Sequence, residues 1–355
     1  MSGKANTEEA VRKSFFQQAE WCVKLGSPLM GQLANCLGRC LDTNTKTGNR
    51  ILTWQGDPSA NGDAVALRLS GVLHALVRRG AAPDLAPFYE ADAILENNAL
   101  AEVLIKTIKA NDPEIMEWLD FAPQTNEVRR AAVIYPGLAK ISDITGLPIA
   151  LYELGASGGL NLQMNSFAYE IAETIYGAKN SAVRLVPEWT GFRPKPAAVN
   201  VVSRRGCDLN PLSVERAEDR EKLIAYLWPD QPERITRTQA AIDIACQDPP
   251  QLDRMDAASW VEKILENGLK SGVAHVFYHT IAWQYFPQET KDRITNAMES
   301  AGKVASVENP LFWLSFEFSG GENPELAMRE WPGGGKVLLA KAPPHVHSIE
   351  WLLSD

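Results

Sequence analysis

A glycine-rich turn in the middle of the chain has residue types and spacing that suit a small-molecule site. It follows an apolar run at residues 147–152, which is typical of a buried strand, and reads Glu-Leu-Gly-Ala-Ser-Gly-Gly-Leu-Asn over residues 153–161. Residues 160–167 could then open a helix. A strand, a turn and a helix in this order can hold a dinucleotide or S-adenosylmethionine, or can present a serine nucleophile.

The serine interpretation depends on residues 155–159, Gly-Ala-Ser-Gly-Gly, which satisfy the G-x-S-x-G pattern of a nucleophile elbow. Asp208 and His279 follow Ser157 in an order that could complete a triad. The elbow of that hydrolase fold comes after several strands, one of which supplies the oxyanion loop, whereas the half of this chain before the turn has a helical pattern. A polar Glu153 is also unexpected in an elbow strand. A serine hydrolase therefore stays an alternative that fits only in part.

The dinucleotide interpretation requires G-x-G-x-x-G, with an acid about 20 residues further on at the end of the next strand. The turn offers Gly155, Gly158 and Gly159, so the second required glycine is missing. The acids near the expected distance are Glu170 and Glu173, in a segment with weak strand character. This pattern therefore also fits only in part.

The methyl-donor interpretation explains more residues together. Glu153 at the strand end, followed by Gly155-x-x-x-Gly159-x-Asn161, resembles the first motif of class I S-adenosylmethionine-dependent methyltransferases. In that class the acid binds the amino group of the donor, directly or through water, and the glycines let the backbone approach the ligand. The donor-binding residues that the resemblance implies in this turn are Glu153, Gly155, Ala156, Ser157, Gly159 and Asn161.

Two later strand ends extend this resemblance. Asp208 ends the strand expected at residues 199–207, where the class places the carboxylate that accepts both ribose hydroxyls, and Leu209 follows it in the implied donor site. Asp256 and Ala257 resemble the acid-plus-small-residue turn that contacts adenine. An ordinary α/β sheet with acidic strand ends would show the same residues, so this alternative stays open.

The gap between Gly159 and Asp208 is longer than one helix requires, which departs from the class pattern. We therefore expect an inserted segment near residues 164–198. Residues 183–191 within it could form a hairpin that covers the donor or the acceptor.

The catalytic residues we predict are His279 and Tyr278, at the end of a strand expected at residues 273–279. Ligands in open α/β sheets bind at the carboxyl ends of strands, and a neutral histidine there could take a proton from an acceptor hydroxyl or amine. Methyl transfer would be an in-line displacement in which positioning supplies most of the acceleration. Residues 279–283 replace the Asn-Pro-Pro-Tyr type of acceptor motif. A histidine with a structural role, and a non-catalytic binding or regulatory protein, are therefore the alternatives.

Two other polar groups have structural explanations. Asn126 and Glu127 are placed to cap a helix expected at residues 127–144, although they could also close over the donor. His345 and His347 have no third convincing ligand, so we predict no metal site.

The elements that must position these residues indicate two parts. Residues 1–145 are predicted to form a helical domain, with helices at 8–25, 63–79, 91–109 and 127–144. Residues 146–355 are predicted to form an α/β domain, because strand and helix patterns alternate. Its expected strands are 149–154, 199–207, 251–255, 273–279 and 303–308, and its expected helices are 213–227, 231–246, 257–269 and 287–301. Short antiparallel strands are expected at 311–318, 326–331, 336–342 and 348–353, with Gly333-Gly-Gly335 as one turn.

Composition limits the class of protein. The 355 residues are 45% hydrophobic and 22% charged, as in an ordinary globular protein, and the net charge of −9 argues against a broad nucleic-acid surface. Five cysteines without a C-x-x-C pair indicate a reducing, cytoplasmic compartment. The polar start of the chain is not a secretory signal, and no apolar stretch reaches the ~18 residues that span a bilayer, so we expect no membrane partner.

The whole chain also resembles a bacterial family catalogued as a domain of unknown function. The resemblance rests on residues 123–128, the turn at 153–162, and the segments 206–211, 227–230, 279–287 and 331–334. It implies a Rossmann-like, class I methyltransferase-like sheet behind a helical N-terminal part. It names no substrate, so the methyl acceptor stays unknown. Where such proteins often end His-Pro-His-Gly, this chain has Pro344-His-Val-His347.

Overall fold

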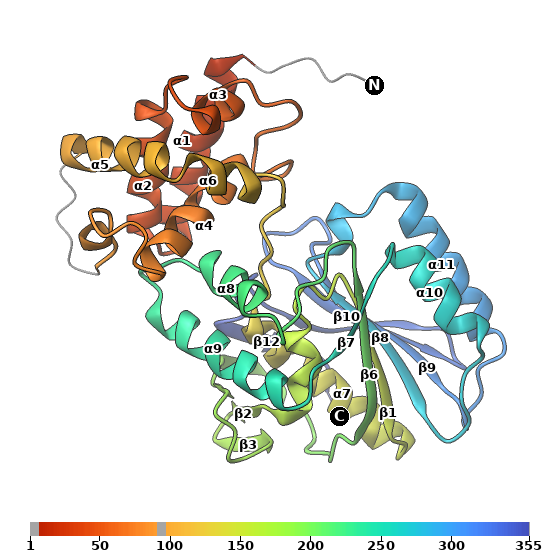
Figure 1. The fold of residues 1–355 in the computed structure, drawn as a ribbon. Helices are drawn as coiled ribbons and strands as arrows, with labels where there is room; N and C mark the ends of the chain where they lie inside the picture. The colour runs from red at the N-terminus through yellow and green to blue at the C-terminus, as the bar shows by residue number, and fades with distance from the viewer. Residues whose placement is uncertain (1–6, 91–96, 355) are drawn as a thin grey trace. The chain divides into compact units, whose positions relative to one another are not determined.

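The computed structural model describes residues 7–90 and 97–354, which fold as two compact units (Figure 1). The first unit consists of Met1–Thr125 and Glu221–Thr236, and the second consists of Asn126–Arg220 and Arg237–Asp355. The chain therefore passes from one unit to the other three times. This division differs from a single boundary at residue 145, because a segment from the middle of the chain belongs to the helical unit.

The first unit is helical. Its helices are α1 (Glu8–Lys24), α2 (Pro28–Cys40), α3 (Lys46–Leu52), α4 (Val65–Arg78), η1 (Ala86–Tyr89), α5 (Asn97–Ala110) and α6 (Asp112–Trp118). Residues 91–96 of the helix expected at 91–109 lie outside the described residues. Ser27 accepts a hydrogen bond from the Met30 amide and Pro28 occupies the first helical position, so the Gly-Ser-Pro break after α1 also begins α2.

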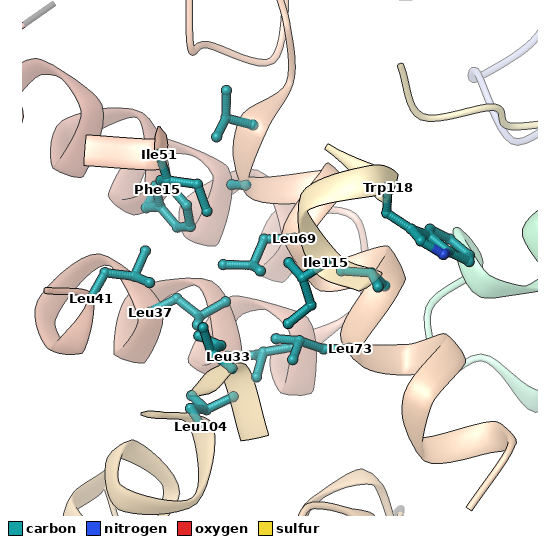
Figure 2. Close-up of a cluster of buried hydrophobic side chains, with 14 of the residues drawn as sticks. Phe15, Leu33, Leu37, Leu41, Ile51, Leu69, Leu73, Leu104, Ile115 and Trp118 are labelled. Atoms are coloured by element: carbon teal, nitrogen blue, oxygen red, sulfur yellow. The ribbon is translucent and has the colours of Figure 1, made fainter. Parts of the chain in front are cut away.

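Apolar residues three or four positions apart form the core of this unit, and Figure 2 shows how they converge from several helices. Phe15 of α1, Leu37 of α2 and Leu69 of α4 are each at most 1% exposed. Burial of side chains of this size is the main stabilising contribution in a helical unit.

Residues 221–236 pack into the same unit. Tyr226 lies 5.9 Å from Trp118 between ring centroids, and the His74 Nδ1 atom is 3.0 Å from the Ala225 carbonyl oxygen. A Cβ atom at Gly71 would lie only 2.5 Å from the Tyr226 ring. The residue at position 71 must therefore be glycine if Tyr226 is to pack against α4.

We expect Gly71→Ala to lower the free energy of unfolding. The overpacking cost of about 1–3 kcal/mol outweighs the gain of up to about 1 kcal/mol that alanine brings inside a helix. Urea denaturation followed by circular dichroism measures the change, and a cycle with Tyr226→Leu should recover part of the loss. An alanine variant as stable as the wild type would mean that residues 221–236 do not pack on α4 in solution.

The second unit contains a nine-stranded sheet and a three-stranded sheet. The strands are β1 (Ile149–Leu154), β2 (Ala168–Ile171), β3 (Thr174–Gly177), β4 (Arg184–Leu185), β5 (Glu188–Gly191), β6 (Val201–Asp208), β7 (Gln251–Arg254), β8 (Ala274–Thr280), β9 (Leu311–Glu317), β10 (Glu325–Trp331), β11 (Lys336–Lys341) and β12 (Ser348–Trp351). The helices are η2 (Val128–Arg130), α7 (Ala131–Thr145), η3 (Leu160–Ser166), α8 (Ala217–Ala225), α9 (Pro232–Gln247), α10 (Ala257–Glu266), η4 (Trp283–Tyr285) and α11 (Gln288–Gly302), although Glu221–Thr236 of α8 and α9 belong to the first unit.

The order of the large sheet is β5-β12-β11-β10-β9-β8-β1-β6-β7. Strands β7, β6, β1, β8 and β9 are parallel to one another, which agrees with the expected alternation of strands and helices. The antiparallel arrangement expected for the last strands holds from β9 to β12, but β9 also pairs in parallel with β8. The second unit is therefore a mixed α/β structure with a mostly parallel sheet.

The chain order creates a switch point beside the central strand. From β1 the chain continues to β6 and β7 on one side, and then returns to β8 and β9 on the other side. All seven residues of β8 are buried, as expected for a central strand covered on both faces. Ligands of open α/β sheets bind outside the carboxyl ends of strands at such a point, and Glu153 of β1 and Tyr278 of β8 lie there.

Two local expectations are wrong. Residues 303–308 form turns rather than a strand, because α11 continues to Gly302 and the Asn309 side chain accepts hydrogen bonds from the backbone and side chain of Ser306. Residues 183–191 do not form a hairpin, since β4 pairs with β2 in the small sheet and β5 pairs with β12 in the large sheet. In the described ranges 7–90 and 97–354, no helix is long and apolar enough to cross a membrane.

Candidate functional site

The turn after β1 has a tight backbone conformation. Gly155, Ser157 and Gly159 have φ angles of 69°, 53° and 68°. Glycine adopts such angles without strain, whereas a serine there is uncommon and is found most often at functional sites. The Ala156 amide donates to the Cys207 carbonyl over 2.9 Å, which ties the turn to the end of β6.

The protein's own packing already requires two of these glycines. A Cβ atom at Gly155 would lie 2.9 Å from the Ala282 Cβ atom, and one at Gly159 would lie 2.8 Å from the Pro250 Cγ atom. The glycines therefore let neighbouring loops approach the turn, in addition to any ligand.

Asp208, at the end of β6, holds the turn through its carboxylate. Oδ2 accepts from the Ser157 amide at 3.0 Å, and Oδ1 accepts from the Asn210 amide at 2.8 Å. A carboxylate has about four lone-pair sites, so Asp208 is an acceptor for several donors at once. The next residue, Leu209, is 67% exposed and offers an apolar surface beside this carboxylate.

Glu153 is buried beside Tyr278, its partner in the parallel pairing of β1 and β8. Burial raises the pKa of Glu153 to about 8, and the Asp208 charge adds to the rise, while the Tyr278 hydroxyl and Arg130 lower it. The hydroxyl lies beside the carboxyl group without completing a hydrogen bond of normal geometry, because Tyr278 Oη and Glu153 Oε2 both lack a partner among the described residues. With a pKa of about 8, the Glu153 carboxyl group is mostly protonated near neutral pH in the free protein.

Four polar atoms without partners lie near the ends of β1 and β8 and in the segment after β1. Within the described part of the chain, these buried atoms are Glu153 Oε2, Ser157 Oγ, Asn161 Oδ1 and Tyr278 Oη. Buried polar groups in proteins are nearly always hydrogen-bonded, so such exceptions indicate atoms whose partners a ligand or water supplies. All four belong to the predicted site.

Asn126 and Glu127 also contact this segment. Asn126 Oδ1 accepts from the Leu160 amide at 2.9 Å, and the Asn161 side chain donates to the Glu127 carbonyl at 3.2 Å. The capping expectation holds for Glu127, whose carboxylate accepts from the Arg129 amide at the start of η2. Asn126 instead caps the segment after the glycine turn, and the bond to the Glu127 carbonyl orients the Asn161 side chain.

His279 lies on the opposite face of the sheet from Tyr278, because neighbouring side chains on a strand alternate. Tyr278 pairs with Leu314, which lies against Gly137 of α7, whereas Phe277 packs near Trp260 of α10. The two residues predicted as catalytic are therefore brought to the same edge of the sheet but to different faces.

Glu317, at the end of β9, is a site residue that the sequence pattern did not reveal. Its Oε1 atom lies 2.7 Å from His279 Nδ1 and also accepts from the Ala282 and Trp283 amides at 2.9 and 3.2 Å. The available signal was an acid directly after an apolar strand, as at Glu153. We expected β9 only in an antiparallel arrangement, so its carboxyl end was not placed beside that of β8.

Asp256 has a structural explanation in the fold. It is the N-cap of α10, where Oδ1 accepts from the Ser259 amide at 3.0 Å, and Oδ2 is 3.4 Å from the Thr290 hydroxyl. Ala257 is the first residue of this helix and is buried. A contact of either residue with adenine stays a prediction.

The serine triad is not assembled in the structure. Ser157 Oγ and His279 Nε2 both lack hydrogen-bond partners among residues 7–90 and 97–354, and the carboxylate on His279 Nδ1 is that of Glu317. Asp208 instead contacts the backbone amide of Ser157.

We therefore expect a fluorophosphonate probe to leave Ser157 unlabelled, because no base activates its hydroxyl. Intact-mass spectrometry after incubation would detect a covalent adduct, with Ser157→Ala as the matched control. An adduct that is present in the wild type and absent in the alanine variant would restore the hydrolase alternative.

His345 lies in the same unit, with its Nδ1 atom 3.6 Å from Glu127 Oε2. Among the residues that the structure describes, no group of three histidine, cysteine, aspartate or glutamate side chains could hold a metal ion.

The fold and the strand-end site define an α/β protein with an added helical unit. A family described as "Uncharacterized protein conserved in bacteria (DUF2332)" matches residues 12–351, and the chain belongs to this family. Neither a curated protein nor a solved structure matches the chain.

Proposed function

We propose that this protein binds S-adenosylmethionine and transfers its methyl group to a small-molecule or protein acceptor. The observation that carries the proposal is the group of buried polar atoms without partners at the carboxyl ends of β1 and β8. They lie where the strand order reverses, the usual ligand position in a doubly wound sheet. The central order β7-β6-β1-β8-β9 is that of a Rossmann-like sheet, which supports a class I methyltransferase-like domain.

The chemistry of these atoms suits the amino-acid end of the donor. Asn161 Oδ1 is an amide oxygen and only accepts hydrogen bonds. Glu153 Oε2 likewise only accepts them when the carboxyl group is ionised. An ammonium group donates three hydrogen bonds and favours the ionised acid, so it would satisfy both atoms and offset the burial of Glu153.

The other end of the donor fits Asp208 and Leu209. The Asp208 carboxylate at the end of β6 is the acceptor proposed for the ribose hydroxyls, and the exposed Leu209 side chain could pack against adenine. Bound in this way, the donor supplies an electrophilic methyl group, and the protein contributes orientation rather than a nucleophile.

Calorimetric titration of the full-length protein with S-adenosylmethionine, and separately with NADH, tests the proposal. We expect micromolar binding of S-adenosylmethionine alone. Binding of NADH alone, or of neither, would overturn it. Formation of S-adenosylhomocysteine in a bacterial extract would then distinguish an enzyme from a binding or regulatory protein on the same fold.

The five cysteines are free thiols, which supports a reducing, cytoplasmic location as part of this proposal.

A further inference from the structure

The face of the sheet that carries His279 has its own polar atoms without partners. His279 Nε2 and Trp313 Nε1 are both buried and lack hydrogen-bond partners among the described residues, and the two rings lie 5.9 Å apart at 62°. We propose that this pair binds the hydroxyl group of an aromatic acceptor, and that Glu317 is the residue that positions His279 for it. The inference rests on the proposed methyl transfer and names the acceptor class.

Glu317 determines which nitrogen of His279 can act as a base. A carboxylate oxygen only accepts, so the 2.7 Å contact between Oε1 and Nδ1 places the imidazole proton on Nδ1. Nε2 of the neutral ring then carries the lone pair. Because the same Oε1 atom also accepts from the Ala282 and Trp283 amides, the backbone fixes the carboxylate in this position.

The two unpaired atoms specify the ligand group by their hydrogen-bonding character. Nε2 of His279 requires a donor, whereas the indole Nε1 of Trp313 is only a donor and requires an acceptor. A hydroxyl group supplies both. A carboxylate offers no donor and an ammonium group offers no acceptor, so neither satisfies the pair.

The surroundings favour a planar aromatic ligand. Trp283 stacks on His279 with centroids 4.9 Å apart and 16° between the planes, and it meets Trp313 and Phe286 edge-on at 5.5 and 5.8 Å. Aromatic rings select aromatic ligands through stacking and edge-to-face contacts. Nε2 is covered in this arrangement, so the ligand reaches it when Trp283 moves. The neighbouring Ile281 has a φ of 50°, a strained angle for a β-branched residue, which marks where the backbone stores strain.

The proposed chemical step requires the methyl group of the donor to lie beside the bound hydroxyl. The hydroxyl O–H bond breaks as its proton passes to Nε2, and the oxygen lone pair forms a bond with the methyl carbon of the donor. The carbon–sulfur bond breaks and its electron pair returns to sulfur. The products are an aryl methyl ether, a neutral thioether and a protonated His279, so the single positive charge of the donor ends on the imidazolium.

Nitrogen-15 NMR of the full-length protein tests the inference without a known acceptor. The chain has five histidines and ten tryptophans, so selective labelling gives few signals, and His279→Gln and Trp313→Phe assign the two that matter. We expect His279 to carry its proton on Nδ1 in the wild type. Glu317→Ala should let the ring take the other tautomer, and Glu317→Gln should keep the first, because an amide oxygen can accept the same bonds. Glu266→Ala, at an exposed acid of α10, is the matched control.

Phenol and toluene are the ligand probes. We expect phenol to shift the His279 Nε2 and Trp313 Nε1 signals together, and toluene, which lacks the hydroxyl, to shift neither. A wild-type His279 protonated on Nε2, or phenol that moves neither signal, would overturn the inference. Donor binding is not needed for these spectra. A failed S-adenosylmethionine titration therefore contradicts the proposed function alone, and a failed NMR result contradicts the acceptor site alone.

Discussion

Glu153→Gln is expected to give a protein that is more stable than the wild type and that binds S-adenosylmethionine about 10- to 150-fold more weakly. Burial raises the pKa of Glu153 from 4.5 to about 8, so the folded state holds the proton more tightly than the unfolded state. The stability that this group contributes is fully present below pH 4.5 and is lost as the pH rises toward 8. At 1.36 kcal/mol per pKa unit, the loss is roughly 3 kcal/mol at neutral pH and approaches about 5 kcal/mol above pH 8.

Glutamine has no proton to lose, so Glu153→Gln should keep the stability that the wild type loses. Urea unfolding of both proteins between about pH 5 and about pH 9 should show curves that separate as the pH rises. Glu350→Gln, at an exposed acid of β12, should leave the two curves together. A glutamine variant that is less stable than the wild type at the alkaline end would mean that Glu153 is ionised and paired in the folded protein.

The same acid links donor binding to pH. An ammonium group binds the ionised form of Glu153, so below its pKa of about 8 the acid must release a proton when the donor binds. The observed affinity should therefore rise by up to about tenfold per pH unit as the pH approaches 8 from below. Binding sites often lower the stability of the free protein, because their buried polar groups find partners only when the ligand binds.

The strands of the central sheet could be predicted because their sequence patterns are local. The apolar run between Pro148 and the glycine turn identifies β1 with its observed bounds, Ile149–Leu154, and β8, which is buried along its whole length, follows an apolar start in the same way. Gly333-Gly-Gly335 marks the turn between β10 and β11 because glycine permits angles that other residues avoid. The carboxyl ends of parallel strands meet at one edge, so the candidate site also followed from the sequence.

What could not be predicted depends on contacts between distant segments. Residues 221–236 have an ordinary helical pattern, and their contacts with distant residues, such as that of Tyr226 with Gly71, show that they belong to the helical unit. The pairing of β8 with β9 brings Glu317 to His279 from 38 positions away. Side chains alternate along β8, so His279 and Tyr278 lie on opposite faces of the sheet although they are neighbours at the strand end.

Asp208→Ala is the second change with a large expected effect. Its carboxylate is the proposed acceptor for two ribose hydroxyls, and hydrogen bonds to a charged group contribute about 1.5–3 kcal/mol, so donor affinity should fall about 10- to 150-fold. The variant also removes the acceptors of the Ser157 and Asn210 amides, which could loosen the turn. Asp208→Asn keeps one acceptor oxygen and the side-chain volume, and should still weaken binding through the loss of charge.

Calorimetric titration with S-adenosylmethionine measures both Asp208 variants, and Asp256→Ala is the informative comparison. Loss of the α10 cap should cost about 0.5–2 kcal/mol of stability. If Asp256 only caps the helix, donor affinity should stay at the wild-type value, and if it contacts adenine, affinity should fall as well. A change of less than about threefold in both Asp208 variants would assign the ribose to another group, because so small a change corresponds to less than about 0.7 kcal/mol. A large loss in Asp208→Asn with an unchanged unfolding curve would separate ligand binding from support of the turn, since an unchanged stability shows that the turn tolerates the loss of the charge and of one acceptor oxygen.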